Sequence, residues 1–219
     1  MDHHISCVAK VLKQLADNPR VPGSPRDVCS ICIDLGDLAG AIIDTGFIDA
    51  VWHFPSEANS VGLEGMFVKR KFDNGKKTAA AIFYDKRLSA PEATFEQRAK
   101  RRFIVAKEVS GVFDRAGEQT ATAPEIRDLV SGMISKSTGV NDSKQIRADY
   151  NGVLLAIELI IPFERRKAII AQGPITSAVV EKLAQDCCFP AQYVRIALDT
   201  RYMNIIDRFR QKAKVKNLI

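Results

Sequence analysis

One nearly all-apolar stretch constrains the fold of this 219-residue chain more than any other feature. Residues 153–161 read Val-Leu-Leu-Ala-Ile-Glu-Leu-Ile-Ile, and Glu158 is their only charged residue. Asp142 with Gln145 resembles a capping box that opens a helix, and Pro162 would stop that helix after Ile161. A helix that is apolar on all sides is buried in the centre of a protein. The chain must therefore supply other layers to cover it.

β-Prone segments and further helical patterns supply those layers. Residues 68–72 and 78–84 are β-prone and flank Asp73-Asn-Gly75, a strong hairpin signal. A short N-terminal helix is expected before the Pro- and Gly-rich residues 18–25. Apolar spacing predicts further helices over residues 26–45, 95–113, 174–187 and 190–199. The fold class is therefore α+β, with a small sheet and hairpin followed by a helical C-terminal part.

Four segments of the chain, in order, match the pattern of a known family. The segment Arg101-Arg-Phe-Ile-Val-Ala-Lys-Glu-Val-Ser-Gly111 resembles the active-site helix of the ImmA/IrrE family of zinc metallopeptidases, in which an Arg-Phe lead-in and an alanine precede H-E-x-x-H. Residues 81–85 are similar to the family's strand before that helix, and residues 149–162 (DYNGVLLAIELIIP) to its E-x-E-A-N-x-F-A-A-E-L-L-M-P helix. Leu183-Ala184 with Val194 and Leu198 is similar to the helix pair that follows. The resemblance covers about residues 80–199 and implies a minimal zincin-like domain, with an active-site-type helix and a helix-turn-helix-like C-terminal part.

The residues that would bind zinc do not match the family. H-E-x-x-H works because positions i and i+4 share one face of a helix, so that two imidazoles hold the ion while the glutamate activates its water. Here the two ligand positions are Lys107 and Gly111, and only the general-base position, Glu108, is kept. The third-ligand position falls on Asp149. The chain's histidines lie elsewhere, at His3, His4 and His53. We expect a degenerate site with no metal, no cofactor and no active catalytic residue.

Lys107 and Asp149 occupy positions that converge on one cation in the parent family. An ammonium could therefore stand where zinc stood, because a paired ammonium and carboxylate compensate for each other's loss of water. We predict that the Lys107 ammonium lies within about 4 Å of Asp149 or Glu108. The alternative is that Lys107 turns into solvent.

The charge is unevenly distributed along the chain. Residues 1–60 hold four Lys or Arg against eight Asp or Glu, whereas residues 61–219 hold 28 against 18. Such a balance favours an acidic partner, nucleic acid included, although solvated surface charge is the simpler interpretation. The helix pair 174–199 could act as a helix-turn-helix, or could pack on the domain. The candidate nucleic-acid contacts are Gln192, Tyr193, Arg195, Arg208, Arg210 and Lys212.

Cysteine usage and hydropathy bear on location. Five cysteines with no regular framework predict reduced core thiols and a cytoplasmic protein. Lys10 and Lys13 interrupt the only apolar stretch near the N-terminus, so no signal peptide is expected. The longest apolar stretches are too short to span a membrane. We expect no membrane association.

The expected organisation has four parts. Residues 1–24 form an N-terminal helix and loop, 25–165 the zincin-like domain, 166–200 the helix pair, and 201–219 a basic tail peripheral to the fold. The resemblance implies an inactive pseudo-peptidase that binds a protein partner, such as a helix-turn-helix transcriptional regulator of a phage, mobile element or stress response. The alternatives are a nucleic-acid-binding regulator that uses the helix pair and tail, and an active metallopeptidase that cleaves a repressor.

Overall fold

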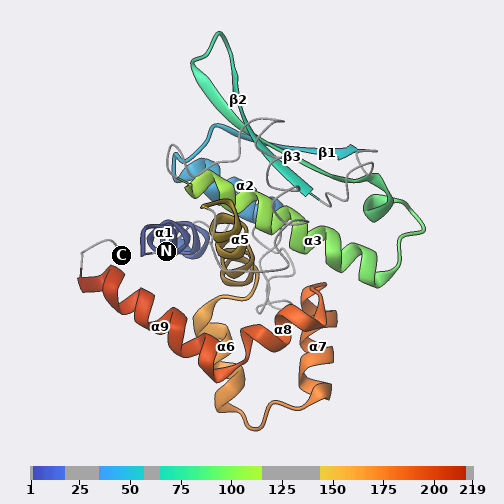
Figure 1. Cartoon of the computed structure of the whole chain (residues 1–219), viewed down its shortest axis with the longest axis vertical. Coiled ribbons are helices and arrows are strands. Elements are labelled where there is room, and N and C mark those ends of the chain that lie inside the picture. Colours follow the sequence, from blue (N-terminus) through green and yellow to red (C-terminus); the bar gives the residue numbers. More distant parts are fainter. Residues whose placement is uncertain (1, 18–34, 57–64, 115–143, 216–219) are drawn as a thin grey trace, which may run out of the picture.

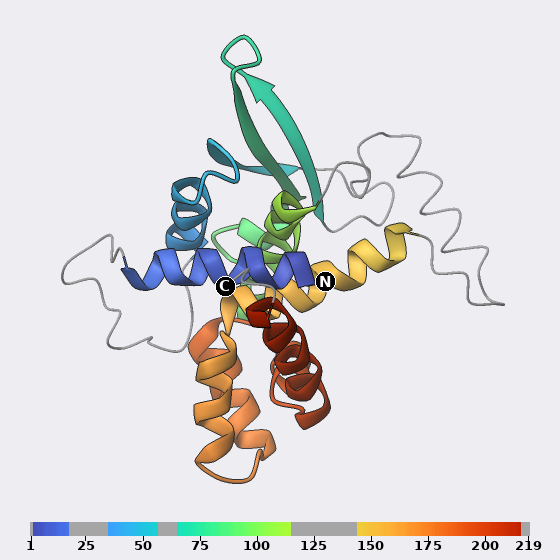
Figure 2. The same ribbon diagram turned by 90° about the vertical axis from the view of Figure 1, so that its left-hand side faces the viewer.

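The fold is built in layers, with the sheet at one end and the C-terminal helices at the other (Figures 1 and 2). The computed structural model describes residues 2–17, 35–56, 65–114 and 144–215. These ranges contain a three-stranded mixed sheet and a larger number of helices, so the α+β class is confirmed. No helix among the described residues is long and apolar enough to cross a membrane.

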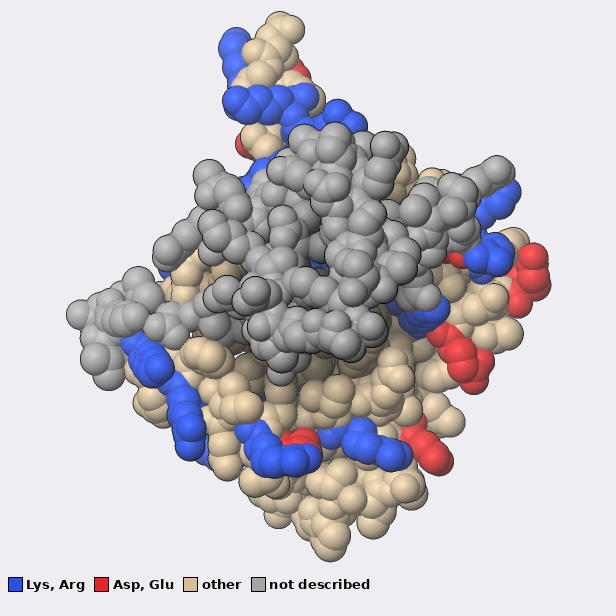
Figure 3. Space-filling view, viewed as in Figure 1, with Lys and Arg blue, Asp and Glu red and all other residues tan. Residues whose placement is uncertain are grey.

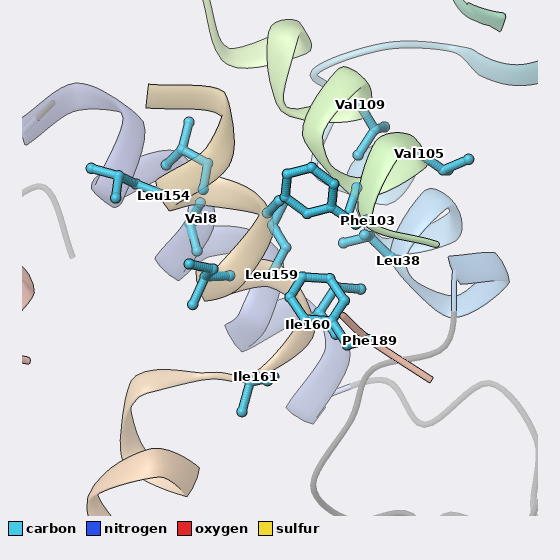
Figure 4. Packing of buried hydrophobic residues seen from close by; sticks show 14 of the residues in the cluster. Val8, Leu38, Phe103, Val105, Val109, Leu154, Leu159, Ile160, Ile161 and Phe189 are labelled. Atoms are coloured by element: carbon cyan, nitrogen blue, oxygen red, sulfur yellow. The ribbon is translucent and has the colours of Figure 1, made fainter. Parts of the chain in front are cut away.

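The apolar stretch forms the C-terminal half of helix α5, Lys144–Ile160, at the centre of the molecule. Leu155, Ile157, Leu159 and Ile160 are each 1% exposed or less, as predicted for a helix that is apolar all round. Side chains from α1, α2 and α3 meet those of α5 in this core (Figure 4). Asp142, the expected start of the helix, lies outside the described residues.

The sheet combines the predicted hairpin with a third strand. Strands β2, Gly65–Phe72, and β3, Lys77–Asp85, pair antiparallel, and β1, Ala50–Ser56, pairs parallel with β3, so that β3 lies in the middle. Asp73, Asn74 and Gly75 have positive φ angles of 52°, 54° and 82° in the connecting turn. The Asp-Asn-Gly sequence therefore forms the turn that it predicts, because these residue types tolerate the left-handed region best.

Helices α2, Leu35–Asp44, and α3, Phe95–Val109, cover the inner face of the sheet (Figure 1). A 3₁₀ helix, Lys86–Ser89, connects β3 towards α3, and a second, Ser110–Phe113, extends α3 to the predicted end at Phe113. Thr94 and Gln97 form a reciprocal capping box at the start of α3. The helix predicted over residues 26–45 is observed from Leu35, and residues 26–34 lie outside the described ranges.

The N-terminal helix α1, Asp2–Asp17, is part of the same core as the sheet and α5. Ile5, Val8 and Val11 are each 3% exposed or less. His4, also buried, lies 3.0 Å through Nε2 from the Asp114 carboxylate beyond α3. The N-terminal helix is therefore tied to the residue that follows the 3₁₀ turn after α3.

The predicted helix pair is present. It consists of α7, Ser177–Cys187, and α8, Ala191–Ala197, and it follows an unpredicted helix α6, Phe163–Ala171. Cys188, in the left-handed region with φ 45°, ends α7, and Pro190 precedes α8. Phe189, between them, is fully buried, and its ring contacts the Phe103 ring of α3 edge-on. The turn of the pair thus packs on the domain.

The cysteines agree only in part with the expected reduced thiols. Cys7 is a free, buried thiol and Cys188 is free. Cys187 is buried as expected but is disulfide-bonded, so the expectation fails there. Cys29 and Cys32 lie outside the described residues.

The expectation of a peripheral basic tail from residue 201 is wrong. Helix α9, Thr200–Val215, packs on the body of the protein beside α1 (Figures 1 and 2). Tyr202, Met203 and Ile206 are buried, Ile206 completely, and Phe209 packs against the core. These apolar side chains share one helix face. Arg201, Arg208 and Lys212 are exposed and gave the segment its tail-like composition, whereas Arg210 is only 19% exposed and packs against Phe163.

A buried polar cluster joins α9 to α5 and α6. Arg166 of α6, fully buried, donates through Nη2 to Glu158 of α5 and through Nη1 to the Ala197 carbonyl at 3.2 Å. The Tyr202 hydroxyl lies 2.8 Å from Glu158 Oε1 and 3.2 Å from the Leu154 carbonyl oxygen. Burial raises the pKa of Glu158, an effect that the Arg166 guanidinium opposes. The same burial raises the pKa of Tyr202 well above its usual value, so Tyr202 stays a hydrogen-bond donor.

Neighbouring isoleucines of α9 test whether the helix is docked. Ile206→Ala should lower the free energy of unfolding by about 2–5 kcal/mol, because it leaves a cavity in the core. Ile205→Ala is the matched control, since Ile205 is 45% exposed, and should change that free energy by about 0.5 kcal/mol at most. Urea unfolding measures both, and equal effects would contradict the docked helix.

The polar cluster gives a second prediction. Arg166→Met should lower the free energy of unfolding by about 3–5 kcal/mol, because Glu158 is left buried without its cation. Glu158→Leu combined with Arg166→Met removes both charges and should be less destabilised than Arg166→Met alone, as measured by chemical denaturation. If the loss in the double variant equals the sum of the losses measured for Arg166→Met and for Glu158→Leu separately, the two residues are not energetically coupled.

Candidate functional site

The candidate site lies on the last turns of α3, between β2 and α5. Lys107 and Glu108 are in the helix, and Gly111 is in the 3₁₀ turn that continues it. The Ser110 hydroxyl donates to the Lys107 carbonyl at 2.6 Å, which fixes the end of the helix. The capping box at Thr94 fixes the N-terminal end of α3. The buried Ala106 and Val109 anchor its C-terminal turns in the core.

Lys107, which the resemblance places at the first ligand position, is paired with the neighbouring Glu108. Its Nζ lies 3.4 Å from Glu108 Oε1, and the side chains are 22% and 14% exposed. The predicted ion pair is therefore confirmed for Glu108. Asp149 lies in α5, but its side chain is outside the described part of the structure.

Gly152 of α5 makes room for the lysine. A Cβ atom at Gly152 would come within 3.2 Å of Lys107 Cγ and 3.7 Å of Lys107 Cε. Contacts of 3.2 Å are tighter than ordinary van der Waals separation, so a larger residue at position 152 would push the lysine stem aside. The absence of a side chain on α5 thus lets the aliphatic stem of Lys107 lie against this helix.

Gly111, which the resemblance places at the second ligand position, lies under an aromatic ring. A Cβ atom added there would come within 2.7 Å of Phe67 Cδ1 on β2. Real Cβ atoms do not approach other heavy atoms so closely, so any side chain at position 111 requires the Phe67 ring to move. Gly65 lets β2 approach α3 in the same way, because a Cβ there would lie 3.1 Å from Glu108 Cγ.

These residues do not fit a zinc ion. Lys107 presents an ammonium, and Gly111 presents no donor and no space for one. His3 and His4 lie on α1 and His53 on β1, so none of the three is part of α3. Within the described ranges, no group of three or more His, Cys, Asp or Glu side chains could hold a metal ion. No catalytic step through a metal is therefore derived for this site.

Sequence reasoning identified Lys107, Glu108 and Gly111 but missed Phe67 and Gly152. Both come from segments about 40 residues from the helix that they contact. Only the strand pairing that places Phe67 opposite the buried Ile82 turns its ring towards α3. No local pattern signals such a contact.

The candidate nucleic-acid residues on α8 divide into two kinds. Gln192 and Arg195 are exposed. Tyr193 instead stacks on Phe103 of α3, with ring centroids 3.9 Å apart and an interplanar angle of 14°. Its ring is therefore engaged in packing the helix pair on the domain.

The candidates on α9 divide similarly. Arg210 lies 2.9 Å through Nη2 from Glu164 Oε1, and its guanidinium stands 4.8 Å from the Phe163 ring centroid. Arg208 and Lys212 are exposed. The six candidates thus lie on two helices. Tyr193, Arg210 and Lys212 make internal contacts, the last with its Nζ 5.9 Å from the Phe209 ring centroid.

Comparison of the chain with protein-family models, with curated proteins and with solved structures finds no match.

Proposed function

We propose that this protein is a zincin-like pseudo-peptidase that acts by binding a regulatory protein. The observation that carries the proposal is the Phe67 ring over Gly111, where the second metal ligand of an active enzyme would stand. The ion pair of Lys107 with Glu108 supports it, because the carboxylate in the general-base position faces an ammonium at 3.4 Å.

The lysine at position 107, the glycine at position 111 and the Phe67 ring above it are physically compatible with one another. A cation at the Lys107 position repels a metal ion, and the glutamate beside it compensates for that cation's partial burial. An aromatic ring over Gly111 fills space that would otherwise hold water. A site filled in this way is stable without metal, which favours retention of the fold for a purpose other than hydrolysis.

The binding role draws on the resemblance to ImmA/IrrE proteins, whose members commonly act on helix-turn-helix repressors. We propose a transcriptional regulator of that kind as the partner. Exposed apolar side chains on the C-terminal helices, Ile196 at 41% and Ile205 at 45%, are the type of anchor that protein partners bury.

Rebuilding the ligand set tests the loss of the metal site. Lys107→His with Gly111→His should gain little affinity for zinc, because the Phe67 ring occupies the space that the second imidazole needs. Adding Phe67→Ala should raise zinc affinity by about tenfold or more over the double variant, as measured by competition with a chromogenic chelator. Phe67→Ala alone is the control and should bind no zinc. A double variant that binds zinc as tightly as the triple variant would contradict the blocking role of Phe67.

The partner is tested with the full chain and a purified helix-turn-helix repressor encoded beside its gene. We expect a stable complex in size-exclusion chromatography and an intact repressor by mass spectrometry after prolonged incubation with zinc. Failure to form a complex would contradict the binding role. Cleavage of the repressor that Glu108→Gln abolishes would instead establish the active-peptidase alternative.

A further inference from the structure

The β2–β3 hairpin projects from the body of the protein as a two-stranded ribbon (Figures 1 and 2). The first half of β2 is covered by α3, where Gly65 and Phe67 lie close to the helix. From Lys69 onwards the strand is exposed, apart from the half-buried Phe72, and the turn and Lys77 are exposed as well. The ribbon beyond α3 is thus accessible from both sides.

Positive charge is concentrated on this ribbon. Lys and Arg side chains cover it in the space-filling view (Figure 3). Between residues 69 and 77, Asp73 is the one acidic residue. The cations of the ribbon are Lys69, Arg70, Lys71, Lys76 and Lys77.

These cations lie on both faces of the ribbon. Successive side chains of a strand point to opposite faces, so Lys69 and Lys71 share one face and Arg70 the other. Lys77 pairs with Phe72 and therefore lies on the Arg70 face. The ribbon can contact negative charge on either side at once.

Little within the protein neutralises this charge. In the described part of the chain, Lys69, Arg70, Lys71 and Lys76 form no ion pair. Lys77 lies 4.0 Å from Asp73, with both side chains about half exposed, and exposed pairs of this kind contribute little. The ribbon therefore presents almost its full positive charge to a partner.

We infer that the hairpin binds double-stranded DNA, lying in the major groove with its cations against the phosphates on both sides. The major groove of B-DNA is about 12 Å wide and admits a two-stranded β-ribbon. Cations on both faces of a ribbon match the two phosphate backbones that flank a groove, whereas a flat anionic surface would meet only one face. The turn, Asp73-Asn74-Gly75, is polar and offers no apolar side chain to insert into a membrane.

This surface is distinct from the degenerate site and from the helix pair. Phosphate contacts position a protein on DNA without reading sequence, so the hairpin would bring the protein, with whatever it binds, to DNA of any sequence. The inference stands whether or not the proposed protein partner is found.

The test compares two variants that each lose the same amount of charge. Lys69→Gln, Arg70→Gln and Lys71→Gln neutralise the hairpin, while Arg195→Gln, Arg208→Gln and Lys212→Gln neutralise exposed cations of α8 and α9. Binding is measured by fluorescence anisotropy with a labelled duplex of about 20 base pairs, over salt from about 50 to 200 mM. Thermal melting checks that both variants stay folded.

The hairpin variant should lose about tenfold or more in affinity at the lowest salt, and the logarithmic salt slope, about −4 for the unaltered chain, should shrink by about three. The helix variant should stay within about threefold of the unaltered chain. A second hairpin variant, Lys76→Gln with Lys77→Gln, should also weaken binding, whereas Lys69→Arg with Lys71→Arg should retain it.

Four results would overturn the inference. They are no binding of the unaltered chain to duplex DNA at low salt, equal losses in the hairpin and helix variants, a loss confined to the helix variant, and tighter binding of single-stranded DNA of the same length. The second would mean that net charge alone drives binding. The third would assign nucleic-acid binding to the helix pair and α9.

Discussion

Burial of the apolar half of α5 is the constraint on which the rest of the structure depends. Because the buried residues 154–160 lie on all sides of the helix, no single neighbouring layer can cover them. Helix α3 with the sheet behind it, α1, and the C-terminal helices each cover part of α5. Helix α9 completes this cover and brings Tyr202 to the buried Glu158. One core therefore extends from the sheet to the C-terminal helices.

The arrangement of side chains at the end of α3 follows from the same packing. The end of α3 lies between α5 and β2, and the two glycines at its contacts allow close approach on both sides. Gly152 admits the stem of Lys107, and Gly111 admits the ring of Phe67. An ion pair and an aromatic ring fill this space.

Elements with a strong local pattern could be predicted from the sequence. The hairpin at Asp73-Asn-Gly75, helix α3 and the buried α5 were of this kind. The Lys107–Glu108 pair was predicted from the family resemblance and not from a local pattern. Docking of α9 was missed because the prediction relied on the segment's many cations and gave too little weight to the apolar residues that share one face of the helix. The Phe67 contact depends on strand pairing, which no local spacing encodes. The basic ribbon was missed because the turn divides its cations between two strands, and only their pairing joins them into one surface.

Zinc content of the purified full chain tests the central claim most directly. That claim is that Lys107 and Phe67 occupy the positions that metal ligands fill in the resembling enzymes. Protein expressed in zinc-supplemented medium, dialysed without chelator and analysed by elemental mass spectrometry, should contain far less than about one zinc per chain, because a zinc site needs about three protein ligands. Any histidine tag must be removed by cleavage first, since its imidazoles bind zinc themselves. A content of about one zinc per chain that Asp149→Asn reduces would contradict the account.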